Sequence, residues 1–89
     1  MQELKVSSKS KPQKVAGAIL GVLRDQPEAE LLAIGAGASN QAIKAVAIAR
    51  NMASSDGIDI VCVPAFGETS IDDRELTIMR LIVKTQKIA

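Results

Sequence analysis

Hydrophobic and polar residues alternate along the first segment of this chain with the two-residue period of a strand. In Glu3–Ser8, Leu4 and Val6 point to one side, and Lys5 and Ser7 point to the other. Such alternation is typical of a strand with one buried face. We therefore predict a half-buried strand at the N-terminus, followed by a polar, basic loop.

The next segment has the spacing of a helix. Pro12 suits a first helical turn because its missing N–H costs no hydrogen bond there, and Pro27 ends the segment. One apolar stripe along this helix contains Val15, Ile19, Val22 and Leu23. Gly17 and Gly21 each cost about 1 kcal/mol relative to alanine inside a helix. We therefore expect this helix to pack closely on the sheet or on a second helix.

A continuous apolar run over Glu30–Gly37 predicts an interior strand. Ser39 or Asn40 is a suitable cap for a second helix over Asn40–Ser54. This helix is apolar around most of its circumference. Its narrow polar stripe contains Asn40, Lys44, Asn51 and Ser55. Because one small chain covers only part of such a helix, we expect a second copy on the remaining face, in a two-fold homodimer.

Two further strands complete the pattern. Ile58–Phe66 is apolar, and Pro64 near its end favours an edge or bulge position. A polar loop over residues 67–75 leads to a last strand, Leu76–Lys84, so these strands form a hairpin with a long tip. The predicted fold is an α/β two-layer domain, residues 1–89, of order β-α-β-α-β-β. Right-handed crossovers place both helices on one face of a mixed four-stranded sheet.

Composition narrows the class of protein. The chain has one Phe and neither Trp nor Tyr, so its core is aliphatic. It has no apolar run of about 18 residues and no apolar region near Met1 that would mark a signal peptide. Cys62 is the single cysteine and has no disulfide partner in the chain. We expect a cytoplasmic protein without a membrane segment.

The Gly35-Ala36-Gly37 turn, between a strand and a helix, has the outline of a nucleotide-binding loop. Asn40 replaces the third glycine of the dinucleotide motif, and the chain has no Gly-Lys-Ser/Thr sequence. We therefore expect no nucleotide cofactor. Helix N-termini still attract anions, so a single backbone phosphate is compatible with this turn and with Lys44 one turn later.

Nothing in the sequence points to catalysis. The chain contains no histidine, and Cys62 lies between Val61 and Val63 in an apolar run typical of a core. The carboxylates of Asp72, Asp73 and Glu75 lie at the hairpin tip, where water solvates charge. They lack the ligand density of a calcium loop. We expect neither an enzyme nor a metal site.

Positive charge gathers in one segment. Residues 5–14 contain four lysines and no acidic residue: Lys5, Lys9, Lys11 and Lys14. In the predicted topology the loops after the first two strands emerge at one edge, which places this segment beside Gly35–Lys44. The chain then has a local basic patch that its net charge of +1 does not reveal. On charge alone, a solvated lysine loop explains the segment equally well.

Two stretches, "LKVSSKSKPQKVAGAILGVLR" and "AIGAGASNQAIKAVAIAR", closely resemble the stage V sporulation protein S family. The "VPAF" strand, with its polar loop and closing strand, fits the same family. The order of elements also resembles, more distantly, the Alba chromatin and RNA-binding proteins. Lys11-Pro12 at the start of the first helix and Lys44-Ala45-Val46 in the second carry that likeness.

The Alba resemblance implies a homodimer that binds the backbone of DNA or RNA without acting as an enzyme. The predicted contact residues are Lys9, Lys11, Lys14, Asn40, Lys44 and Arg74. Acidic residues surround Arg74, and this hairpin is shorter and less basic than an Alba arm. Two alternatives remain: an assembly module in sporulation or septation that binds proteins only, and a small ligand held by the glycine turn.

Overall fold

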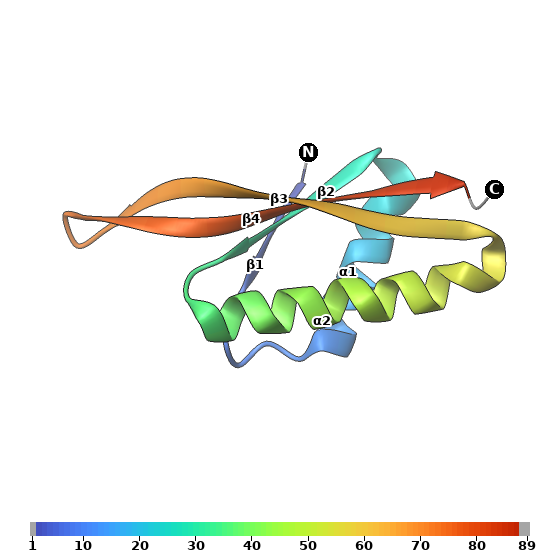
Figure 1. Ribbon diagram of the computed structural model, residues 1–89, viewed down its shortest axis with the longest axis horizontal. Coiled ribbons are helices and arrows are strands. Elements are labelled where there is room, and N and C mark those ends of the chain that lie inside the picture. Colours follow the sequence, from blue (N-terminus) through green and yellow to red (C-terminus); the bar gives the residue numbers. More distant parts are fainter. Residues whose placement is uncertain (1, 88–89) are drawn as a thin grey trace.

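The computed structural model describes residues 2–87 as one mixed four-stranded sheet with two helices on one face (Figure 1). The elements are β1 (Gln2–Val6), α1 (Pro12–Asp25), β2 (Glu28–Ala33), α2 (Ala36–Ala53), the short 3-10 helix η1 (Ser54–Asp56), β3 (Ile58–Ile71) and β4 (Arg74–Lys87). The predicted α/β two-layer class and the order β-α-β-α-β-β are confirmed.

The strands lie in the order β1-β2-β4-β3. β1 and β2 are parallel, and β4 is antiparallel to both of its neighbours, β2 and β3. Each helix therefore connects two parallel strands, as in a crossover. β3 is an edge strand, the first of the two positions expected for Pro64.

The core lies between the helices and one face of the sheet. Ile19 of α1, Leu31 of β2, and Leu81 and Val83 of β4 have their side chains fully buried. Leu31 and Leu81 are direct partners across the β2–β4 pair, so they point to the same side of the sheet. The predicted stripe of α1 faces this layer, and Val6 of β1 is buried against it. The core is aliphatic, as the composition requires.

The start of α2 differs from the prediction. The helix begins at Ala36 rather than Asn40, and β2 ends at Ala33 rather than Gly37. Gly35 precedes the helix with a φ of 89°, a backbone conformation that suits glycine, so the chain turns directly from strand to helix. No side chain caps the helix, so the capping role expected for Ser39 or Asn40 was wrong.

The hairpin also differs from the prediction. β3 and β4 have 14 residues each and pair along their whole length, so residues 67–75 are mostly strand rather than loop. Asp72 and Asp73 alone form the turn, and the hairpin projects well beyond the helices (Figure 1). No helix covers this part, so its side chains lack the apolar alternation that reveals a strand. Residues 85–87, expected as a tail, continue β4, while 88–89 lie outside the described residues.

Two further expectations concern the helix surfaces. Gly17 and Gly21 are exposed, and a Cβ at either position has nothing within 4 Å, so the close packing expected there was wrong. On α2, Ile43 and Met52 are 52% and 53% exposed, so the chain leaves part of the apolar surface of this helix uncovered.

Within residues 2–87, neither helix has the length and apolar character needed to cross a membrane.

Candidate nucleic-acid interface

The loop between β1 and α1 is closed by its own serines. The backbone N–H of Ser7 donates to Ser10 Oγ at 2.9 Å, and the N–H of Lys9 donates to Ser7 Oγ at 3.2 Å. A further bond of 3.1 Å runs from the Ser10 N–H to the Ser7 carbonyl. These local bonds define the turn, while the side chains of Lys9 and Lys11 remain exposed.

This loop is docked on the first turns of α2. The side-chain amide of Gln41 donates to the Ser10 carbonyl at 2.8 Å. Gly37 lies so close to the loop that a Cβ on it would be 3.0 Å from the Cβ of Ser8. The second glycine of the Gly-Ala-Gly turn therefore makes room for the chain's own loop. In a nucleotide-binding turn, a glycine at this position lets the backbone approach a pyrophosphate instead.

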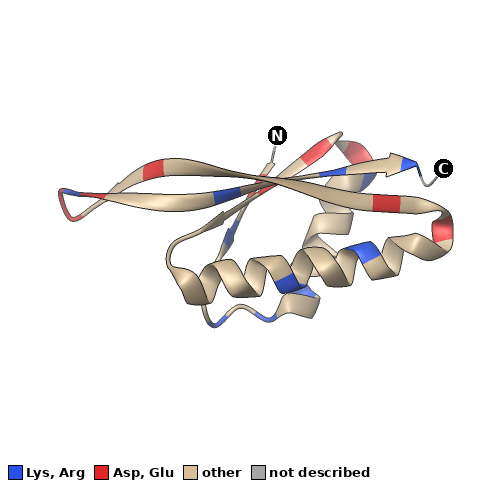
Figure 2. Cartoon of the chain, viewed as in Figure 1, with Lys and Arg blue, Asp and Glu red and all other residues tan. Residues whose placement is uncertain are grey.

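The docked loop brings most of the predicted contact residues to one place, where the β1–α1 loop meets the first turns of α2. Lys11 immediately precedes α1, and Lys14 lies in its first turn. Lys44 lies one turn beyond Gln41 along α2, and helix neighbours three residues apart share a face. The blue positions of the loop and of the adjoining helices lie on the helix side of the molecule in Figure 2. The exposed contact residues at this place are Lys9, Lys11, Lys14, Asn40 and Lys44.

Lys5 borders this surface from β1, although it was not among the predicted contact residues. It lines a shallow hollow of about 320 Å³ together with Lys11 and Lys14, over apolar side chains of β1 and α1. Its place in the lysine-rich segment was a usable signal. We call Lys5, Lys9, Lys11, Lys14 and Lys44 the lysine cluster. Among the described residues the ion pairs are Arg50–Asp59 and Arg80–Glu30, so no lysine of the cluster is neutralised by one.

Arg74 is not brought to this cluster within one protomer. It is the first residue of β4, next to the turn formed by Asp72 and Asp73. That turn lies at one end of the long axis, away from the β1–α1 loop (Figure 1). Asp72, Asp73 and Glu75 surround Arg74 in the sequence, and Figure 2 colours positions of both charges at this tip.

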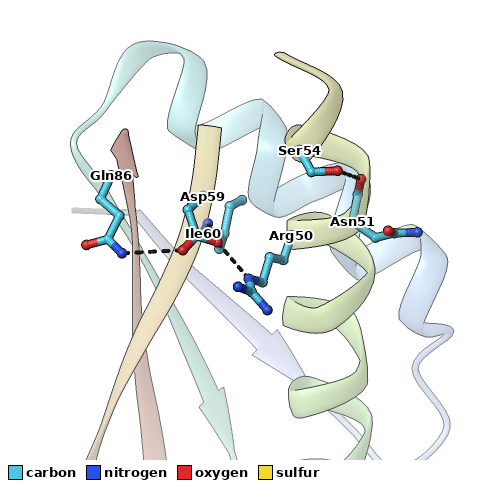
Figure 3. Close-up of polar contacts among 6 residues, drawn as sticks. All are labelled: Arg50, Asn51, Ser54, Asp59, Ile60 and Gln86. Carbon is cyan, nitrogen blue, oxygen red and sulfur yellow. Dashed lines mark hydrogen bonds and ion pairs between the residues drawn. The ribbon is translucent and has the colours of Figure 1, made fainter. Parts of the chain in front are cut away.

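The opposite end of α2 is tied to the sheet by an ion pair (Figure 3). Arg50 Nε donates to Asp59 Oδ1 at 2.6 Å, and Gln86 donates to the other carboxylate oxygen at 3.3 Å. The hydrogen bond from Arg50 is the main cause that lowers the pKa of Asp59 below its ordinary value, and the bond from Gln86 adds to it. These contacts fix the C-terminal end of α2 on β3, while the docked loop fixes its N-terminal end.

The described residues contain no group of three or more His, Cys, Asp or Glu side chains placed to hold a metal ion. Cys62 is half-buried and packs against the hydrophobic core, as its apolar neighbours indicated.

Comparison with known protein families assigns the chain. Residues 2–86 match the stage V sporulation protein S (SpoVS) family. The chain belongs to this family. Since the match covers nearly all of the 89 residues, it includes the docked loop, both helices and the hairpin of this SpoVS-family protein. The family makes it a sporulation-related protein.

Proposed function

We propose that this SpoVS-family protein is a non-enzymatic, cytoplasmic module that binds the phosphate backbone of DNA or RNA. The observation that carries the proposal is the docking of the β1–α1 loop on α2 by the Gln41–Ser10 hydrogen bond of 2.8 Å. It holds lysines from two distant segments at one surface. Unpaired lysines at fixed spacing attract a polyanion and position it.

The chemistry of the surface favours backbone contacts over base recognition. Lysine carries a strongly hydrated point charge suited to phosphate oxygens. The cluster has no aromatic residue on which bases could stack, since the one aromatic side chain, Phe66, lies on β3. We therefore propose binding with little dependence on nucleotide sequence, as the resemblance to Alba proteins also implies.

An electrophoretic shift panel of duplex DNA, single strands and structured RNA, run across salt concentrations, tests this function. If four to six phosphates are neutralised, log K falls with log salt with a slope of about −0.9 per contact on duplex DNA. The double variant Lys9→Gln/Lys14→Gln then has a shallower slope by about two contacts.

Lys84→Gln/Lys87→Gln is the matched control, because it removes the same charge from two exposed lysines of β4. Its salt slope should equal that of the wild type. Equal losses in both double variants would show that net charge, rather than the lysine cluster, governs binding. Absence of any shift at low salt would overturn the function.

We further propose that the protein acts as a homodimer. Ile43 on α2 is 52% exposed, and Phe66 on the edge strand β3 is 76% exposed, so two neighbouring elements present apolar side chains to solvent. Burial of such residues against a second copy is favourable. Sedimentation velocity should give the mass of two chains for the wild type and of one chain for Ile43→Asp. A monomeric wild type would exclude the dimer.

The exposed apolar residues also support the alternative of an assembly module that recruits a protein in sporulation or septation. Under that alternative the purified chain shifts no nucleic acid at low salt, and a protein partner co-purifies with the wild type but not with Phe66→Asp.

A further inference from the structure

The face of the sheet opposite the helices is hollowed. β2 and β4 form its floor, since Leu32 of β2 pairs with Arg80 of β4. β1 and β3 form its walls, with Lys5 beside Leu32 on one side and residues 69–71 of β3 on the other. A cleft of about 600 Å³ lies over this floor, between the β1–α1 loop and the outer part of the hairpin.

The lining of this cleft is mainly apolar. Leu32 and Ile78 form the floor, and Ile78 is only 8% exposed although no helix covers this face. Ile34 and Ile71 form the rim and are 47% and 43% exposed. Clefts of 300–1,000 Å³ with apolar walls are typical of small-molecule sites. The size and lining therefore suit a small molecule with an apolar body.

One charge borders the cleft. Lys5 lies in its wall, and no carboxylate among the described residues lies within ion-pair distance of this lysine. The neighbouring hollow shares Lys5 and the apolar floor with this cleft and is also lined by Glu3, Glu30, Glu68 and Arg80, of which Glu30 and Arg80 pair with each other. The hydroxyl groups of Ser8, Thr69 and Ser70 also line the cleft. An apolar floor with a single unpaired cation is complementary to a molecule that has an apolar chain and one anionic end.

We propose that this cleft binds a small carboxylate with a saturated acyl chain. The carboxylate lies against the Lys5 ammonium group, and the chain lies along Leu32 and Ile78 between the two exposed isoleucines. The Glu30–Arg80 pair ends the apolar floor on its other side. The floor therefore suits a short acyl chain better than it suits the longer apolar face of a helix from another protein. This site does not depend on nucleic-acid binding, although Lys5 borders both surfaces.

Calorimetric titration of the full chain with octanoate, hexanoate and 1-octanol, below micelle-forming concentrations, tests the proposal. Octanoate should bind roughly tenfold more tightly than hexanoate, because two further CH₂ groups are buried. Lys5→Gln should weaken octanoate at least fivefold and leave 1-octanol unchanged. Amide chemical shifts should move at Leu32, Ile71 and Ile78.

Two controls make the result specific. Lys84→Gln removes a lysine from the same sheet face, at a position paired with Val61 and Glu28 rather than near the cleft, and should bind octanoate like the wild type. Lys9→Gln should do the same even where it weakens nucleic-acid binding, so the two functions are tested separately. Equal affinity for octanoate and 1-octanol, equal loss in the two sheet-face variants, or shifts confined to the helices would each overturn the proposal.

Discussion

Gly67 on β3 lies directly against the aliphatic part of the Arg80 side chain on β4. A Cβ at position 67 would be 2.6 Å from Arg80 Cδ and 3.1 Å from Ile78 Cγ1. Glycine in a strand often marks such a close approach. The space left by Gly67 holds the Cγ and Cδ atoms of Arg80, whose Nε donates to the buried carboxylate of Glu30 on β2. That hydrogen bond raises the pKa of Arg80 above its ordinary value.

Gly67→Ala should therefore destabilise the protein, although alanine is the less flexible residue. The added methyl group displaces Arg80 from Glu30, and overpacking of this kind costs about 1–3 kcal/mol. Urea unfolding measures the loss. In a Glu30→Gln/Arg80→Ala background, where the long side chain is absent, the same substitution should cost much less. Equal costs in both backgrounds would show that the Arg80 contact is not the cause.

Gly21→Ala should have the opposite sign. A Cβ on Gly21 has nothing within 4 Å, and alanine is favoured over glycine in a helix by up to about 1 kcal/mol. We expect a higher urea midpoint for this variant, and the same for Gly17→Ala. A loss of stability that grows with protein concentration would instead show that a second copy packs closely on this face of α1.

The ion pair between Arg50 and Asp59 gives a prediction for acid unfolding. The folded-state pKa of Asp59 lies below its ordinary value of 3.8, mainly because Arg50 donates a hydrogen bond to it. A lowered pKa contributes stability that is present above pH 3.8 and is lost as the pH falls through the folded-state value. The wild type should therefore lose more stability than Asp59→Asn as the pH falls below 3.8.

Carboxyl NMR titration gives a direct check on the cause. Arg50→Gln should raise the pKa of Asp59 toward 3.8. Arg24→Gln removes an arginine from the last turn of α1 and should leave the pKa of Asp59 unchanged. A matching rise in both variants would assign the shift to net charge rather than to the Arg50–Asp59 contact.

Much of the fold could be predicted because short-range patterns set it. The alternation of Leu4 and Val6 marked β1, and Pro12 marked the first residue of α1. The start of α2 was misplaced because Gly35 turns the chain through a positive φ without any side-chain cap. The outer hairpin was missed because no helix covers it, so its side chains follow no apolar period.

The candidate site was only partly predictable. The order of the strands implied that the lysine loop lies near the start of α2. The contacts that hold it there, between Gln41 and Ser10 and between Gly37 and Ser8, join segments about 30 residues apart and leave no local pattern. The same holds for Glu30 and Arg80, which are 50 residues apart in sequence. Such pairs form only when the sheet is assembled, so no short stretch of the sequence reveals them.

The turn of the hairpin carries the last prediction. Asp72 and Asp73 have φ values of 51° and 62°, the left-handed conformation that a two-residue type I′ turn requires at both positions. Asn-Gly is the preferred pair in such turns, and a left-handed conformation costs a non-glycine residue about 1 kcal/mol. Asp72→Asn/Asp73→Gly should therefore slow amide hydrogen exchange of Ile71 and Arg74, the hydrogen-bonded pair that closes the turn, about fivefold. Asp72→Asn/Asp73→Asn removes the same two charges without the glycine and should have a smaller effect. Equal slowing in both variants would assign the strain at the tip to charge repulsion among its carboxylates rather than to backbone conformation.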